Sequence, residues 1–341
     1  MKKHLNTLYI TTDNTWLSKD GDTIKIQLDG QCLGRFPLHN IQGIISFGWN
    51  ILVSPQLMEA CLVQGIHITF CNPYGKFLAT VQGNFKGNVL LRRSQYRLAD
   101  NEELHVPIAR EMIAAKIANC RTLLMRVART YDMSAKMQGA IDQLKSYVRM
   151  ARKNQVLDQL RGIEGTAADV YFKVFDFCLV NQDPNIHFTQ RQRRPPQDPV
   201  NALLSFLYTL LSHDARSALA SVGLDPDVGF LHRDRPGRHS LALDLMEEFR
   251  APMADRLVLT LLNRKQLKCN DFEIQDNGAV LLKEESRKIV LQAWQERKSQ
   301  TIDHPFLNEK VTVGFLMHIQ AQILAKTIRG EMNEYVPYIW K

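Results

Sequence analysis

The amino-acid sequence changes character near residue 100, and this change constrains the fold more than any other feature. The first ninety or so residues contain short apolar runs separated by turn residues, such as LYITT, TIKIQLDG and GIISFGWNILV. Runs of this length and type are typical of β-strands. One helix interrupts them, with Pro55 in its first turn and Gly65 as its stop signal. We therefore predict a β-strand-rich domain at residues 1–100.

Beyond residue 100 the apolar residues recur with helical spacing, and Pro252 is expected to kink or break one of the resulting helices. Asn277-Gly278, between two apolar runs, predicts a hairpin. Helices are expected at residues 107–131, 134–153, 155–179, 200–223, 240–264, 284–300 and 307–330. The fold class is thus predicted to be α+β, with a larger all-helical domain at residues 101–341.

The charge balance favours a polyanionic partner without identifying one. The formal net charge is +8, and residues 110–153 carry ten basic side chains against three acidic ones. A solvated helix face would look the same. The chain starts with polar residues instead of a signal peptide, and its apolar runs are too short to cross a bilayer. A cytoplasmic protein without a membrane partner is expected.

Two segments carry residues suited to metal chemistry. In GIEGTAADVYF, Glu164 lies between Gly162 and Gly165, and glycines inside a helical pattern suggest close approach of a backbone, a ligand or another helix. In GFLHRDRPGRHSLALDLMEEFR, His232 precedes an acidic pair at Asp244 and Glu247. The i, i+3 spacing of that pair puts both carboxylates on one helix face.

Apolar neighbours around Asp244 predict a desolvated carboxylate that needs a partner. A histidine with carboxylates suits Mg²⁺ or Mn²⁺, and thiolates are absent from both segments. The alternatives are a solvated glutamate, a core or capping histidine and the edge of an amphipathic helix. Glu248 competes with Glu247 as the last ligand, although the spacing from Asp244 favours Glu247. His239, beside Arg238, is expected to contact phosphate or cap a helix.

Three blocks in this order, GIEGTAADVYF, RRPPQDPVNALLSFLYTLL and GFLHRDRPGRHSLALDLMEEFR, resemble the CRISPR-associated protein 1 family of spacer-acquisition integrases, and are most similar to type I-C versions. The resemblance covers essentially the whole chain. It implies metal ligation by Glu164, His232 and Glu247, with Asp244 as an additional acidic residue of the catalytic site.

The resemblance also implies a homodimer that binds double-stranded DNA and joins with CRISPR-associated protein 2. A Cas4-type nuclease is a further candidate partner. The implied reaction is insertion of short DNA fragments as new spacers into a CRISPR array, by attack of a 3′-hydroxyl on a phosphodiester. The same metal-dependent site would act as an endonuclease with water as the attacking group.

Arginines near the site are candidates for phosphate contacts that position DNA without reading its sequence. Arg233, Arg235 and Arg238 flank His232 and are the favoured set. Three arginines of a proline-containing linker, Arg191, Arg193 and Arg194, could equally be solvated charges. Two tyrosines of the family blocks, Tyr171 and Tyr208, are expected in the core. The rival interpretations are a stand-alone structure-specific nuclease and a DNA-binding scaffold with structural carboxylates.

Overall fold

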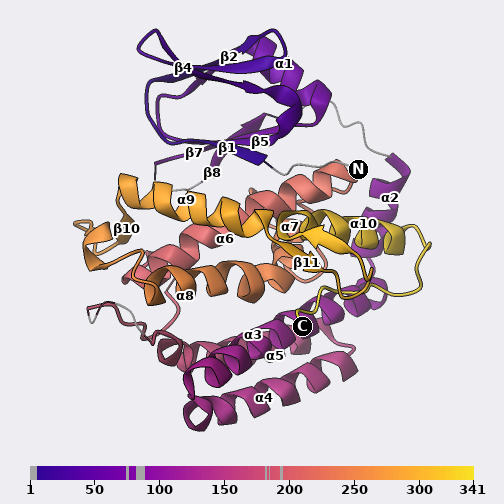
Figure 1. Cartoon of the computed structure of the whole chain (residues 1–341). Helices are drawn as coiled ribbons and strands as arrows, with labels where there is room; N and C mark the ends of the chain where they lie inside the picture. Colours follow the sequence, from indigo (N-terminus) through magenta and orange to yellow (C-terminus); the bar gives the residue numbers. More distant parts are fainter. Residues whose placement is uncertain (1–5, 74–76, 82–88, 181–182, 184, 193–194) are drawn as a thin grey trace. The chain divides into compact units, whose positions relative to one another are not determined.

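The computed structural model describes residues 6–73, 77–81, 89–180, 183, 185–192 and 195–341. The chain divides into two compact units, one comprising Met1–Lys86 with Glu284–Gln300 and the other Gly87–Lys283 with Thr301–Lys341. The predicted combination of a β-rich N-terminal region and a helical C-terminal region is confirmed (Figure 1). The chain enters each unit twice, so a single cut along the sequence does not separate the two.

The first unit contains two four-stranded sheets. One has the order β1 (Asn6–Ile10), β5 (Ile41–Phe47), β7 (His67–Cys71), β8 (Phe77–Val81); the other has the order β4 (Gln31–Pro37), β3 (Thr23–Leu28), β2 (Thr15–Asp20), β6 (Leu52–Val53). Their buried core includes Leu17, Ile24 and Ile44. Pairing is parallel from β1 through β5 to β7, and antiparallel between β7 and β8.

Two helices complete the first unit. In α1 (Pro55–Gln64), the Ser54 side chain accepts a hydrogen bond from the Leu57 N–H, and Gly65 ends the helix at a φ of 71°. This left-handed conformation carries no Cβ penalty in glycine, so the predicted start and stop signals are confirmed. The second helix, α9 (Glu284–Ser299), is distant in sequence and lies against β1.

The second unit is mainly helical, with α3, α4 and α5 side by side at one end (Figure 1). Its α-helices are α2 (Val89–Ala99), α3 (Glu102–Tyr131), α4 (Ser134–Lys153), α5 (Leu157–Lys173), α6 (Pro199–Ser221), α7 (Ser240–Met246), α8 (Arg256–Asn263) and α10 (Leu316–Ile328). Its two hairpins pair β9 (Phe272–Ile274) with β10 (Val280–Leu282) and β11 (Thr301–Asp303) with β12 (Lys310–Thr312). The first is the hairpin that Asn277-Gly278 predicted.

Several helix ends differ from the prediction. The helix expected to start at Pro107 begins at Glu102, where two glutamates in the first turn complement the helix dipole. Helix α2 was not among the predicted helices. The predicted helix at residues 155–179 ends at Lys173 and gives way to a 3₁₀ turn, η2 (Phe175–Cys178). The last helix starts at Leu316, because β11, β12 and the 3₁₀ turn η6 (Val313–Phe315) take up the preceding residues.

Pro252 interrupts helical geometry as predicted. A 3₁₀ turn, η3 (Glu247–Phe249), and a π-helical turn, η4 (Arg250–Asp255), separate α7 from α8. Proline has no N–H to donate, so the regular i to i−4 pattern cannot run through it. The short turns η1 (Leu38–Asn40) and η5 (Cys269–Asp271) complete the elements. Among the described residues, no helix combines the length and apolar character needed to cross a bilayer.

Candidate metal centre

The three predicted metal ligands line one cleft of the second unit. Glu164 comes from the middle of α5, His232 from the loop before α7, and Glu247 from the start of η3. The cleft has a volume of about 290 Å³, and the remaining side chains that line it are Arg161, Leu231, Arg233, Arg235 and Arg238. Residues far apart in the sequence therefore combine two carboxylates with four arginines in one cleft, and these four arginines are called the basic rim below.

Asp244 lies behind His232 instead of lining the cleft. Its side chain is fully buried. Backbone N–H groups of three consecutive residues donate to its carboxylate, from Phe230 at 2.6 Å, Leu231 at 2.9 Å and His232 at 3.0 Å. The His232 ring Nδ1 lies 2.6 Å from Asp244 Oδ1. Because an ionised carboxylate only accepts, this contact assigns the ring proton to Nδ1 and leaves Nε2 as an electron-pair donor.

Gly229 makes this arrangement possible. A Cβ at this position would lie 2.8 Å from Asp244 Oδ2 and 2.9 Å from the Ser240 carbonyl carbon. Both distances are shorter than real Cβ contacts, and the second involves backbone that cannot rotate away. By contrast, a Cβ at Gly162 or Gly165 would meet no atom within 4 Å. The predicted close approach of backbone or another helix at those two glycines is therefore wrong.

Glu247 is buried between two cations. Lys116 Nζ lies 2.8 Å from its Oε2, and Arg250 Nη2 lies 2.9 Å from its Oε1. His232 Nε2 is 3.9 Å from the same Oε1. Burial alone would raise the pKa of Glu247, but the positive charges of Arg250 and Lys116 outweigh it and lower the pKa below its usual value. Glu247 is thus an ionised carboxylate at neutral pH.

Lys116 also forms an ion pair with Glu164, so one ammonium group bridges both carboxylates of the cleft. Sequence reasoning counted Lys116 in the basic stripe and missed this role. The signal was available in the apolar surroundings of IAAKIANC, because a lysine is almost never fully buried unless it is paired. Burial lowers the pKa of Lys116, and the charges of Glu247 and Glu164 more than offset this effect, so its pKa is raised.

Glu248, the alternative last ligand, faces away from the cleft. Its buried carboxylate accepts hydrogen bonds from the Tyr335 hydroxyl, from Tyr338 N–H at 2.6 Å and from Gln320 Nε2 at 3.2 Å. Burial raises the pKa of Glu248 to about 8, although these donors act in the opposite direction. Of the two adjacent glutamates, only Glu247 lines the cleft.

The donor set suits a hard divalent cation. Two carboxylates and an imidazole Nε2 are ligands that Mn²⁺ and Mg²⁺ accept, and the Asp244 contact orients the imidazole as in many metal sites. Within the described parts of the chain, no three His, Cys, Asp or Glu side chains are close enough together to hold a metal ion. In this structure Lys116 lies between the carboxylates of Glu164 and Glu247, and the distance between the two carboxylates is set by this ammonium group.

The basic rim includes a residue that sequence reasoning missed. Arg161, one turn before Glu164, donates from Nε and Nη2 to the Leu231 carbonyl at 2.9 and 2.6 Å. Its Nη1 and Arg233 Nη2 both contact Asp158, at 2.7 and 3.2 Å. Arg235 and Arg238 also line the cleft, and their contact with DNA phosphates stays a prediction. The structure thus brings together four arginines within reach of a ligand in the cleft.

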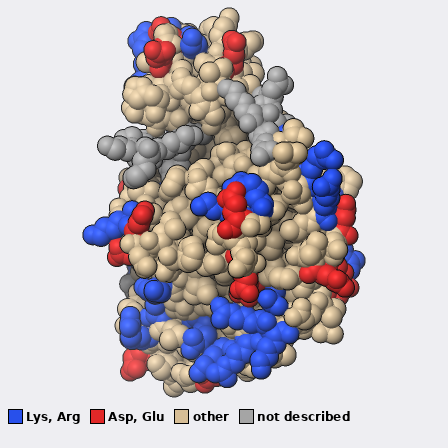
Figure 2. All heavy atoms as spheres, turned by 90° about the vertical axis from the view of Figure 1, so that its right-hand side faces the viewer, with Lys and Arg blue, Asp and Glu red and all other residues tan. Residues whose placement is uncertain are grey.

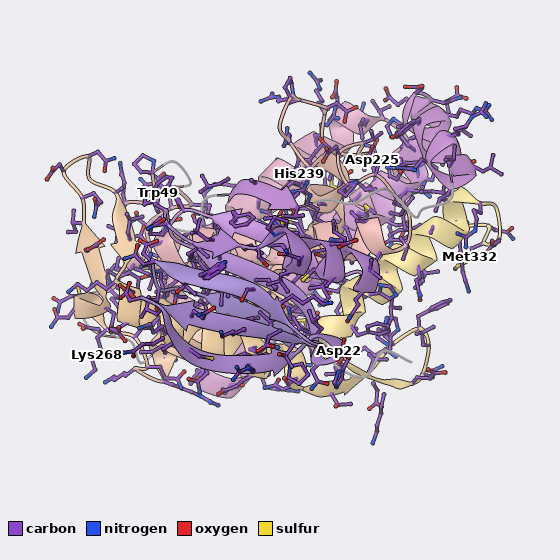
Figure 3. All side chains as sticks on the ribbon, turned by 90° about the horizontal axis from the view of Figure 1, so that it is seen from above. Asp22, Trp49, Asp225, His239, Lys268 and Met332 are labelled. Carbon is purple, nitrogen blue, oxygen red and sulfur yellow. The ribbon has the colours of Figure 1, made fainter. Side chains whose placement is uncertain are left out.

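Other candidate residues lie elsewhere. His239 precedes α7, where its Nδ1 contacts Asp227; Figure 3 shows it near Asp225 of the same loop. Its side chain does not cap the helix. Arg191 donates to Asn201 Oδ1 at 2.7 Å and so ties the linker to α6. The other two linker arginines, Arg193 and Arg194, lie outside the described residues.

The hydroxyls of Tyr171 and Tyr208 donate to Asp255 at 2.8 and 2.7 Å, but Tyr208 is half-buried and not the core residue that was expected. Tyr171 is buried, as expected for a core residue. The ring of Tyr208 also supports the site, because the guanidinium of Arg250 stacks over it at 4.6 Å. This stacking helps to fix the arginine that contacts Glu247.

A basic surface accompanies the cleft in the second unit. Helix α4 presents five exposed basic side chains and one exposed acidic one, Asp142; the five are Lys136, Lys145, Arg149, Arg152 and Lys153. Figure 2 shows Lys and Arg side chains gathered over the end of this unit that α3, α4 and α5 form. The predicted basic stripe is therefore present on α4, whereas Lys116, which the prediction also included, is buried in α3.

Comparisons with known proteins agree along the whole chain. Residues 8–296 match the family model described as CRISPR associated protein Cas1. The chain is 48% identical over 344 residues to a CRISPR-associated endonuclease Cas1 from Chlorobaculum tepidum and 50% identical over 348 residues to another from Rhodospirillum rubrum. Each alignment covers 100% of both chains.

A third relative, a CRISPR-associated exonuclease Cas4/endonuclease Cas1 fusion from Geobacter sulfurreducens, is 35% identical over 97% of this chain and 60% of its own length.

Solved structures share the fold at lower identity. A CAS1 protein from Thermotoga maritima superposes with a TM-score of 0.81 at 24% identity, covering 98% of this chain and 100% of that one. A chain of a Cas6-RT-Cas1–Cas2 complex gives 0.83 at 23% identity, covering 99% and 36%. A casposase bound to integration product gives 0.83 at 22% identity, covering 97% and 92%. With a family model that matches most of its length and relatives about half identical from end to end, the chain belongs to the CRISPR-associated Cas1 family.

Proposed function

We propose that the protein is a divalent-metal-dependent DNA endonuclease and integrase of CRISPR adaptation, which inserts short DNA fragments into a CRISPR array as new spacers. The observation that carries this proposal is the convergence of Glu164, His232 and Glu247 in a cleft rimmed by four arginines. The names of the full-length relatives support endonuclease activity. The resemblance of the sequence blocks to type I-C versions favours that subtype.

Glu164, His232 and Glu247 are the residues that would hold Mg²⁺ or Mn²⁺. When bound, the metal would neutralise charge on the transferring phosphoryl group and activate the attacking oxygen. Asp244 keeps His232 in the tautomer whose Nε2 can ligate. The rim arginines would bind phosphates on either side of the scissile bond and so hold the DNA in register. No covalent protein nucleophile is required.

The same site can serve two reactions, which differ only in the attacking oxygen. A DNA 3′-hydroxyl gives strand joining by transesterification, whereas water gives hydrolysis. Joining requires two DNA molecules to be held together. We therefore propose that a homodimer, formed through the β-rich N-terminal domain, acts with CRISPR-associated protein 2. Fusion of Cas4 to Cas1 in one relative supports a Cas4-type nuclease as a further partner.

Strand transfer tests the proposal. A labelled short duplex with 3′-hydroxyl ends would be incubated with a plasmid carrying the CRISPR repeat, Mn²⁺ or Mg²⁺, and the small partner. The comparison is between the parent protein, Glu164→Gln and Asp169→Asn, because Asp169 is an exposed carboxylate on the same helix.

Joined product is expected from the parent and from Asp169→Asn, and not from Glu164→Gln or in EDTA. Cleavage without joining would favour the stand-alone nuclease. If the protein binds DNA without metal and neither joins nor cleaves it, the interpretation that remains is a DNA-binding scaffold with structural carboxylates.

A further inference from the structure

Lys116 is the cation of the cleft in this structure. Its side chain enters from the middle of α3 and is 10% exposed. Its Nζ contacts Glu164 Oε1 and lies 2.8 Å from Glu247 Oε2. Lys116 therefore bridges the two carboxylates that are proposed as metal ligands, and any metal ion held by both of them would have to share them with this ammonium group.

The charges around these two carboxylates are already balanced. Glu164 and Glu247 carry two negative charges, and Lys116 and Arg250 contribute two positive ones. The charge of Asp244 is met separately, by three backbone N–H groups and the His232 ring. A divalent cation would therefore leave two positive charges unmatched.

An unmatched charge is costly in a buried site, because a low-dielectric environment screens it poorly. The side chains of Glu247 and Lys116 are only 3% and 10% exposed, so water can do little to compensate. Among the described residues, the other charged side chains that line the cleft are arginines, and Asp158 beside them pairs with Arg161 and Arg233. The groups that could restore the balance are anions from outside, and the phosphates of bound DNA are such anions.

We propose that Lys116 makes metal binding conditional on DNA: it weakens the affinity of the cleft for a divalent cation when DNA is absent, and so strengthens the coupling between metal and DNA. This inference rests on the proposed function. Coupling is reciprocal, so the metal must raise the affinity for DNA by the same factor. Lys116 acts here as a positioning and charge-setting residue.

Titration with Mn²⁺ tests the inference without measuring activity. Free Mn²⁺ would be followed by its electron paramagnetic resonance signal, with and without a short duplex, and with a DNA-only blank. The variants are Lys116→Met, Lys116→Gln and Lys116→Arg. Lys326→Met is the matched control, because it removes one positive charge from an exposed position of α10 in the same unit, away from the basic stripe in the sequence. The Gln variant keeps hydrogen-bond donors for the carboxylates if the Met variant folds poorly.

Without DNA, Lys116→Met and Lys116→Gln should bind Mn²⁺ about tenfold more tightly than the parent, a typical size for coupling between sites. Their gain in affinity on adding DNA should shrink by a similar factor. Lys116→Arg and Lys326→Met should behave as the parent does. In EDTA the Met variant should unfold at a lower temperature than the parent, because the buried Glu247 carboxylate then faces the partly exposed Glu164 carboxylate without the lysine between them, and Mn²⁺ should stabilise it more.

The outcomes separate the two proposals. If the parent binds Mn²⁺ but the Met and Gln variants show the same affinity and the same response to DNA, the role of Lys116 is refuted and the metal site stands. If the parent binds no Mn²⁺ with or without DNA, the proposed function itself fails and this inference falls with it.

Discussion

The Nδ1 atom of His232 lies 2.6 Å from Oδ1 of Asp244, and this contact determines what the histidine can do. Three backbone N–H groups hold the same carboxylate in place. The loop that carries His232 is therefore wrapped around the side chain of Asp244, and the direction of the imidazole is set by a buried group with no access to the cleft.

Asp244→Asn tests this positioning role. The asparagine amide NH₂ donates, whereas either carboxylate oxygen of Asp244 only accepts. At least one of the four hydrogen bonds that Asp244 accepts must therefore be lost, and the His232 tautomer is no longer fixed. Metal affinity should fall by about 10- to 100-fold, as for other residues that orient a metal ligand. Titration with Mn²⁺ measures this. Asp234→Asn, at an exposed position of the same loop, should leave the affinity unchanged; an Asp244→Asn protein with parental affinity would contradict the assignment.

Gly229→Ala should lower stability through the same contact. The added methyl group would collide with Asp244 Oδ2 and with the backbone of Ser240. Overpacking of this kind costs about 1–3 kcal/mol, which urea unfolding can resolve. Gly162→Ala is the matched control, because its Cβ would meet nothing within 4 Å and the position is helical. That change should be neutral or stabilising by up to about 1 kcal/mol. Equal effects of the two substitutions on the free energy of unfolding would argue against a close contact between Gly229 and Asp244.

Glu248 should make the free energy of unfolding depend on pH. Its pKa is raised to about 8 in the folded protein from the ordinary 4.5 of a glutamate, so the unfolded chain loses this proton first as pH rises. Stability from this group should therefore fall between about pH 4.5 and 8, by a few kcal/mol, and level off above pH 8. Glu248→Gln should flatten this part of the profile in urea unfolding. A parental slope in the variant would show that Glu248 is not its source.

The rim arginines should govern the salt dependence of DNA binding. Each phosphate contact contributes about one unit to the slope of log K against log salt. Arg233→Ala, Arg235→Ala and Arg238→Ala should each weaken binding to all sequences alike and reduce the slope by about one. Lys19→Ala, at an exposed position of the first unit, is the control. Slopes that stay parental in all three variants would remove these arginines from the interface.

The sequence predicted the parts of the fold that local signals specify. Ser54, Pro55 and Gly65 mark both ends of α1, and Asn277-Gly278 marks a hairpin. It failed where tertiary contacts decide: α2 was not predicted, and the C-terminal segment is held by partners such as Asn119, which donates to the Tyr338 carbonyl at 2.9 Å. Such long-range contacts leave no local pattern to read.

The candidate site divides in the same way. Residue types made Glu164, His232 and Glu247 candidates, the resemblance to the family implied them as metal ligands, and the structure places all three in one cleft. The spacing of Asp244 and Glu247 along the sequence could not predict that Asp244 lies behind His232. That spacing describes only the helix, whereas the contacts of Asp244 come from the loop that carries His232. Nor could the spacing pair Lys116 with the carboxylates, since α3 meets them only after the helices pack.

The adjacent pair Glu247 and Glu248 offers the most direct test of the central claim, because only the first lines the cleft. We would measure strand joining and cleavage in Mn²⁺ by the parent, Glu247→Gln and Glu248→Gln, after checking by thermal unfolding that each is folded. The metal-site account predicts that Glu247→Gln loses both reactions while Glu248→Gln retains them. Retained activity in a folded Glu247→Gln protein would contradict it.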